Sequence, residues 1–109
     1  MTKIKKPWGS ELWFVHNENY LGKLIKVQKG KKLSKQYHNK KEETFFAIKG
    51  KFILEVNNKE ILMEPYRAYT IKPKDIHRVY AKFENVEIIE VSTPQADDIV
   101  RVEDDYDRA

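Results

Sequence analysis

Four residues whose side chains commonly bind divalent metals lie in two short segments of the sequence. The first segment is LSKQYHNKKEE, residues 33–43, which contains Gln36, His38 and Glu43. The second is IKPKDIH, residues 71–77, which ends in His77. Two imidazoles, one amide oxygen and one carboxylate can hold a Zn, Mn, Fe or Ni ion and leave coordination positions open for substrate or water. The sequence therefore contains a candidate metal site, provided that the fold brings the two segments together.

The composition restricts the kinds of metal site and partner that suit this chain. Its 109 residues include no cysteine, so thiolate sites such as zinc fingers and iron–sulfur clusters are excluded. The 21 basic and 17 acidic residues are interleaved over most of the length and give a formal net charge of +4, so we expect an ordinary solvated surface and no nucleic-acid partner. No apolar stretch approaches the roughly 20 residues that span a bilayer. We therefore expect no membrane partner and a soluble, cytoplasmic protein.

Apolar and polar residues alternate with a period near two, which predicts strands. In residues 52–63 this alternation flanks Asn57 and Asn58, which tolerate the positive φ values of a tight turn, so a β-hairpin is expected there. Further strands are predicted at residues 11–16, 23–29, 44–49, 68–72, 77–82 and 86–92. About eight short strands, with no convincing helical pattern longer than two turns, indicate an all-β sandwich or barrel.

The predicted strands also suggest how the four candidate ligands could meet. If LSKQYH is a strand, Gln36 and His38 are two residues apart and project from the same face. Glu43 can return toward that face after the polar NKKE bend. His77 would reach it from a separate strand, and a barrel is the architecture that allows this convergence.

The two segments resemble the two sequence motifs of the cupin superfamily. Residues 30–50, GKKLSKQYHNKKEETFFAIKG, are similar to the first motif, in which a glycine precedes a pair of ligands, a glutamate and a closing glycine. Residues 73–77, PKDIH, are similar to the second, in which a proline precedes the last ligand by four residues. Within the cupins, the sequence most resembles the C-terminal domain of type II mannose-6-phosphate isomerases, through PWGSE at 7–11, EIIEVSTP at 87–94 and DDIVRVEDDYDR at 97–108.

This resemblance implies a jelly-roll β-barrel that binds a divalent metal, most often zinc, through residues matching Gln36, His38, Glu43 and His77. It also implies an isomerase that interconverts an aldose and a ketose, either as sugars or as sugar phosphates, through an enediolate. Lys41 stands where these isomerases generally carry an arginine. Lys41 and Arg101 are our candidates for holding a phosphate or the developing negative charge; the alternative is a solvated lysine and a salt bridge in the tail. No residue is singled out as the base.

We expect residues 1–109 to form a single cupin domain, with a core barrel at about 10–93, an N-terminal arm at 1–9 and an acidic C-terminal tail at 94–109. A small barrel benefits from covering its sheet edges, so a homodimer is expected. Two other functions remain open. One is a non-catalytic module that binds a metal and a sugar. The other is an Fe-dependent oxygenase. The facial triad of those enzymes has two histidines and one carboxylate, so an added glutamine ligand would leave one fewer open position on the metal.

Overall fold

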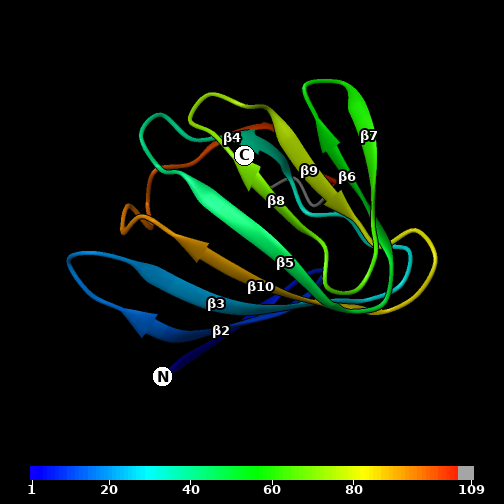
Figure 1. Cartoon of the computed structure of the whole chain (residues 1–109), viewed down its shortest axis with the longest axis horizontal. Helices are drawn as coiled ribbons and strands as arrows, with labels where there is room; N and C mark the ends of the chain where they lie inside the picture. The colour runs from blue at the N-terminus through cyan, green and yellow to red at the C-terminus, as the bar shows by residue number, and fades with distance from the viewer. Residues whose placement is uncertain (106–109) are drawn as a thin grey trace.

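The strands expected from the alternating pattern form two antiparallel sheets that face each other, as Figure 1 shows. The structure is a computed structural model and describes residues 1–105. One sheet has, in order, β1 (Thr2–Lys6), β2 (Gly9–His16), β3 (Leu21–Val27), β10 (Val86–Ser92), β5 (Glu43–Lys49) and β8 (Ala68–Ile71). The other has β11 (Val100–Glu103), β4 (Lys35–Tyr37), β9 (His77–Tyr80), β6 (Phe52–Val56) and β7 (Lys59–Met63). This architecture confirms the predicted all-β jelly-roll barrel.

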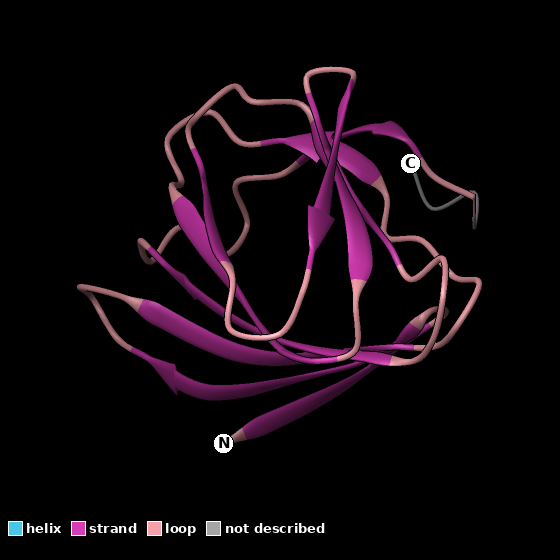
Figure 2. Ribbon diagram, turned by 45° about the vertical axis from the view of Figure 1, so that its right-hand side comes forward, coloured by secondary structure: helices cyan, strands magenta, loops and turns pink. Residues whose placement is uncertain are grey.

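Loops alone connect the strands in the described part of the chain (Figure 2). The predicted hairpin is present: Asn57 and Asn58 have φ values of 48° and 68°, and they join β6 to β7 with Val56 opposite Lys59. Positive φ at both central residues is what the right-handed twist of a hairpin requires. No helix within residues 1–105 is long and apolar enough to cross a bilayer.

The space between the sheets is apolar at one end and charged at the other. Inward-facing residues of the six-stranded sheet at the apolar end include Ile25, Val27, Ala47, Val86 and Ile88, which pack against Phe52, Leu54 and Val79 of the opposite sheet. Two residues from Ile25 in β3, two from Ile88 in β10 and four from Ala47 in β5, the inward residue is charged. These charged residues are Lys23, Glu90 and Glu43. The fold thus gathers buried charges at one end of the barrel.

Both ends of the described chain add strands to the sheets. β1 lies within the expected N-terminal arm and pairs along its whole length with β2, while β11 lies within the expected tail and pairs with β4. Arg78 points outward from β9, and its guanidinium lies 3.0 Å from a carboxylate oxygen of Asp105 and 3.4 Å from one of Glu103. These contacts hold the tail against the barrel. Residues 106–109 of the tail lie outside the described residues.

Candidate metal centre

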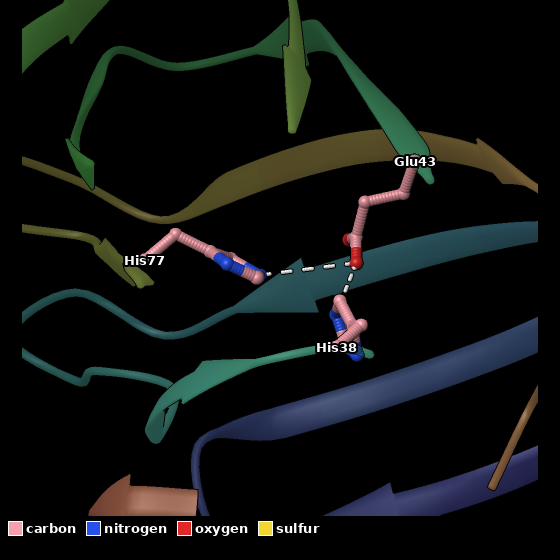
Figure 3. A group of neighbouring side chains, drawn as sticks. All are labelled: His38, Glu43 and His77. Atoms are coloured by element: carbon pink, nitrogen blue, oxygen red, sulfur yellow. Dashed lines mark ion pairs between the residues drawn. The ribbon is translucent and has the colours of Figure 1, made fainter. Parts of the chain in front are cut away.

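His38, Glu43 and His77 meet at the charged end of the barrel (Figure 3). His38 follows β4, Glu43 is the first residue of β5 and His77 is the first residue of β9. All three side chains are buried, and their potential ligand atoms lie within 4.8 Å of one another. Glu43 Oε1 is 2.5 Å from His38 Nε2 and 3.8 Å from His77 Nε2. Three of the four predicted ligands are therefore adjacent.

Hydrogen bonds to backbone carbonyls fix the orientation of both imidazole rings. His38 Nδ1 lies 2.5 Å from the carbonyl oxygen of Asp98, and His77 Nδ1 lies 2.9 Å from that of Asp75. A carbonyl oxygen can only accept a hydrogen bond, so each Nδ1 must carry the hydrogen. In the neutral rings, each Nε2 then has a lone pair directed at Glu43. A backbone carbonyl on the far nitrogen is the usual arrangement around a metal-bound histidine.

The three atoms at the centre lack partners of their own. His38 Nε2, Glu43 Oε1 and His77 Nε2 are all buried, and none has a hydrogen-bond partner within residues 1–105. Two acceptors at 2.5 Å repel each other unless a proton or a metal cation lies between them. Buried polar atoms are rarely left unpaired, because the loss of hydration costs roughly 1–3 kcal/mol for each. The donor set and its unpaired atoms fit a divalent metal ion.

The local electrostatics keep two of these side chains in the form that binds metal. Burial alone would raise the pKa of Glu43, but the adjacent His38 imidazole and the Lys41 ammonium lower it to about 2. Burial lowers the pKa of His77 below its ordinary value, against the opposing effect of the Glu43 carboxylate. A carboxylate and a neutral imidazole are the ligand forms of these residues.

The fourth predicted ligand, Gln36, lies beside this cluster. It is opposite His77 in the pairing of β4 with β9, and it lines the same cavity. Its Oε1 accepts a hydrogen bond of 2.7 Å from the hydroxyl of Ser34. Coordination by Gln36 stays a prediction, and the structure places the residue where it could act.

The cluster opens into a cavity of about 290 Å³ between the two sheets. Arg101 of β11 lies opposite Gln36 of β4, so Arg101, Gln36 and His77 form a row across three neighbouring strands. Arg101 lines the cavity and is partly exposed. Its Nε has no hydrogen-bond partner within residues 1–105, and the nearest carboxylate oxygen, on Asp104, is 4.0 Å away. Arg101 thus lines the cavity while its Nε pairs with Asp104, which is the salt bridge in the tail that was its alternative role.

Comparison of sequences decides the family. Residues 1–104 match the sequence profile of the family described as mannose-6-phosphate isomerase C-terminal. The chain belongs to this family of cupins. Among proteins with curated functions, none matches the sequence significantly.

Solved structures of other cupins have the same fold as this cupin. KdgF from Halomonas sp. superposes with a TM-score of 0.79 at 16% identity, over 90% of this chain and 92% of KdgF. A cupin-2 domain protein from Shewanella frigidimarina gives 0.67 at 20% identity, over 81% and 82%. A cupin-superfamily sugar phosphate isomerase from Silicibacter pomeroyi gives 0.69 at 19% identity, over 77% of this chain and 58% of the isomerase. At these identities the likeness establishes the fold alone.

In this cupin, Lys41 is buried, which excludes the alternative of a solvated surface lysine. Its Nζ donates a hydrogen bond of 3.1 Å to Glu90 Oε2 and lies 3.8 Å from Glu43 Oε1. Burial alone would lower the pKa of Lys41, but Glu90 and Glu43 together raise it above its ordinary value. The ammonium is thus held between the metal centre and a second carboxylate.

Several charged residues that line the cavity were not predicted from the sequence. They include Glu90, and also Glu11 and Lys23, whose Oε1 and Nζ lie 3.3 Å apart. A signal for Glu90 was present: Val86, Ile88 and Glu90 share one phase of the alternation, so Glu90 faces inward with its apolar neighbours. The charge of these residues obscured their inward positions.

Proposed function

We propose that this cupin is a metal-dependent sugar-phosphate isomerase of the mannose-6-phosphate isomerase type. The observation that carries the proposal is one cavity lined by both a buried cluster of metal-ligating atoms and the side chain of Arg101. A sugar phosphate needs both features, because its carbonyl and its phosphate lie at different ends of the molecule. Membership of the mannose-6-phosphate isomerase C-terminal family supports the same chemistry.

His38, Glu43 and His77 would hold the metal, with Gln36 as the fourth ligand and zinc as the expected ion. When bound, a divalent metal polarises the carbonyl of the open-chain sugar and stabilises the oxygens of the enediolate. Gln36 suits this role because a neutral ligand leaves more positive charge on the metal than a second carboxylate would. The backbone carbonyls of Asp98 and Asp75 hold both rings in the required tautomer.

Two cationic side chains, Arg101 and Lys41, have separate proposed roles. Arg101 is the candidate for the phosphate, because a planar guanidinium can donate two parallel hydrogen bonds to phosphate oxygens. Lys41 is the candidate for stabilising negative charge that develops near the metal, because its ammonium is buried and lies 3.8 Å from the ligand atom of Glu43. A charge at a buried position interacts more strongly than one in water.

The test is conversion of mannose 6-phosphate into fructose 6-phosphate by the zinc-loaded protein. A chelator should stop the reaction and added zinc should restore it. Arg101→Met should raise KM for the sugar phosphate at least about 10-fold, equivalent to about 1.4 kcal/mol. Arg67→Met is the matched control, because Arg67 is exposed, does not line the cavity and donates a hydrogen bond to the carbonyl of Leu62.

Two results would overturn the isomerase proposal. In the first, the metal-loaded protein binds a hexose or pentose phosphate but leaves a panel of them unchanged, as a non-catalytic binding module would. In the second, the protein contains iron and consumes oxygen, as an oxygenase would.

A further inference from the structure

Glu90 is a buried carboxylate that neither the metal centre nor the phosphate site uses. It lies on β10, has a relative exposure of 4%, and lines the same cavity as His38, Glu43 and His77. In the six-stranded sheet its register partners are Lys23 on one side and Phe45 on the other. Glu90 is thus placed on the wall of the cavity, beside the metal centre and not in it.

Lys41 fixes one oxygen of this carboxylate. Its Nζ donates to Glu90 Oε2 at 3.1 Å, whereas Glu90 Oε1 accepts no hydrogen bond from the residues that the structure describes. The same ammonium lies 3.8 Å from Glu43 Oε1, so it links Glu90 to the metal centre. One oxygen is therefore held at a set place relative to Glu43, and the other is available to a ligand in the cavity.

A contribution to stability does not explain why Lys41 and Glu90 are buried as a pair. Burying two charges costs several kcal/mol for each ion, and replacing a buried pair by apolar residues is often neutral or stabilising. The preceding inward residues of β10, Val86 and Ile88, are apolar and belong to the core. An apolar side chain at position 90 would have continued that core. The charge at this position therefore calls for a functional reason.

We propose that Glu90 is the base that carries a proton between C1 and C2 of the sugar, and that Lys41 positions its carboxylate. This assignment rests on the proposed isomerase function. Glu90 would be the proton acceptor of the reaction. The metal ligands cannot fill this role while their lone pairs bind a metal.

The proposed step is balanced without any further reactant. Glu90 takes the hydrogen on C2 as a proton, the C–H electron pair forms the C1–C2 double bond, and the carbonyl pair moves onto O1. The protonated Glu90 then returns the proton to C1, while the hydroxyl proton moves from O2 to O1 and the C2 carbonyl forms. The aldose becomes a ketose, and Glu90 ends as the carboxylate with which it began.

Burial makes Glu90 a stronger proton acceptor than a solvated carboxylate. Burial and the negative charge of Glu43 raise the pKa of Glu90, and the ammonium groups of Lys41 and Lys23 oppose this rise. Glu11, on β2, is a further carboxylate at this end of the barrel. A proton carrier is most effective when its pKa lies close to the operating pH.

Two other carboxylates that line the cavity are weaker candidates. Glu11 Oε1 already accepts a hydrogen bond of 2.9 Å from the indole of Trp13 and lies 3.3 Å from the ammonium of Lys23. Asp97 is exposed to solvent, so its carboxylate lacks the fixed, dry surroundings of Glu90. Within residues 1–105, neither forms a hydrogen bond or ion pair with Lys41 like that of Glu90.

The deciding experiment compares Glu90→Gln with the wild type in deuterium oxide. Glutamine keeps the size of the side chain and can still accept the hydrogen bond from Lys41. With mannose 6-phosphate, the wild type should place deuterium at C1 of the product and at C2 of recovered substrate. Glu90→Gln should lower kcat and this exchange at least about 100-fold. It should keep its zinc content and its affinity for mannitol 6-phosphate, a substrate analogue without a carbonyl.

Glu87→Gln is the matched control, because Glu87 lies on the same strand with its side chain on the opposite face. Its kcat and exchange should equal those of the wild type. The Glu90 assignment is overturned if Glu90→Gln retains exchange within about threefold, if it loses zinc, or if Glu11→Gln is the variant that stops exchange. An inactive, zinc-loaded wild type would instead overturn the isomerase function on which the assignment rests.

The pH dependence of kcat/KM tests whether Lys41 positions Glu90. Because the ammonium lowers the pKa of Glu90, Lys41→Met should move the acidic limb of the kcat/KM profile to higher pH. Lys41→Arg should return the limb toward its wild-type position. A loss of rate in Lys41→Met with an unmoved limb would show that Lys41 does not act through Glu90.

Discussion

The two histidines of the metal centre are not interchangeable with other residues of similar size. Each needs one nitrogen that donates to a carbonyl and a second that is free, at opposite edges of a rigid ring. His38 and His77 meet this requirement through carbonyls of Asp98 and Asp75. The third histidine, His16, has its Nε2 3.2 Å from the carbonyl of Pro94, but it is exposed and does not line the cavity. His38 and His77 are therefore the two imidazoles placed to serve the centre.

His77→Ala should abolish metal binding, because it removes one of the three buried ligand atoms that meet at the centre. Elemental analysis should find about one divalent ion per chain in the wild type and a small fraction of that in the variant. His16→Ala should retain the wild-type content. Equal metal content in the wild type and His77→Ala would show that the metal binds elsewhere.

Lys41→Arg should keep or raise the isomerase rate, because arginine retains the positive charge beside Glu43 and can donate two parallel hydrogen bonds. Lys41→Ala should lower kcat at least about 10-fold, equivalent to about 1.4 kcal/mol of barrier. Steady-state kinetics on mannose 6-phosphate would measure both changes. An unchanged kcat in Lys41→Ala would remove this residue from the catalytic candidates.

At the scale of elements, the loop between β4 and β5 depends on a segment far away in sequence. The carboxylate of Asp98 accepts hydrogen bonds from the backbone amides of Asn39, Lys40 and Lys41, at 3.0, 2.6 and 2.9 Å. These bonds lower the pKa of Asp98 from its ordinary value of 3.8 to about 2. The segment that follows β10 thus holds the loop that carries His38.

Asp98→Asn should lower stability at neutral pH by about 1 kcal/mol, a figure reduced because Asp98 is partly exposed. That corresponds to a fall in Tm of roughly 4–8 °C. Because its folded-state pKa is depressed, the Asp98 carboxylate contributes stability above pH 3.8, and this contribution is lost as pH falls toward 2.

Thermal melts of the two proteins should therefore differ most near pH 6 and converge in strong acid. Asp97→Asn, at the adjacent exposed position, is the control and should change Tm little at any pH. A difference between wild type and Asp98→Asn that grows as the pH falls would contradict the assigned contacts.

Sequence alone predicted the elements whose signal is local. The hairpin at Asn57 and Asn58 followed from turn chemistry, and most strands followed from alternation. β1 and β11 were harder, because short edge strands with residues such as Lys3 and Arg101 lack a clear apolar face. Glu90 was missed because an inward charge breaks the alternating pattern that reveals inward positions. The role of Asp98 depends on a partner about 60 residues away, which no local pattern specifies.

At the scale of the whole molecule, the outer face of the six-stranded sheet has an apolar row. Leu12, Leu24, Ile89 and Phe46 are register partners across β2, β3, β10 and β5. All four are at least partly exposed, and Val91 beside this row is 50% exposed. An apolar row of this kind on an otherwise charged protein suits contact with a second copy of the chain.

We expect a homodimer that buries this row. Light scattering should give about twice the chain mass of 13.0 kDa. Ile89→Lys should give monomers, because a charge in the middle of the row would be desolvated without a partner. Val102→Lys is the control, because Val102 is exposed on the other sheet. A monomeric wild type would contradict the expectation.

The contact between His38 and Asp98 also bears on the order of events during synthesis. The candidate ligands lie within residues 36–77, but the carbonyl that orients His38 is added about 60 residues after it. At roughly 5–20 residues per second, a ribosome needs several seconds to add that length of chain. A nascent chain can form the hairpin early, yet it cannot present a finished metal centre until residue 98 has left the exit tunnel. Metal uptake should therefore be a late event in biogenesis.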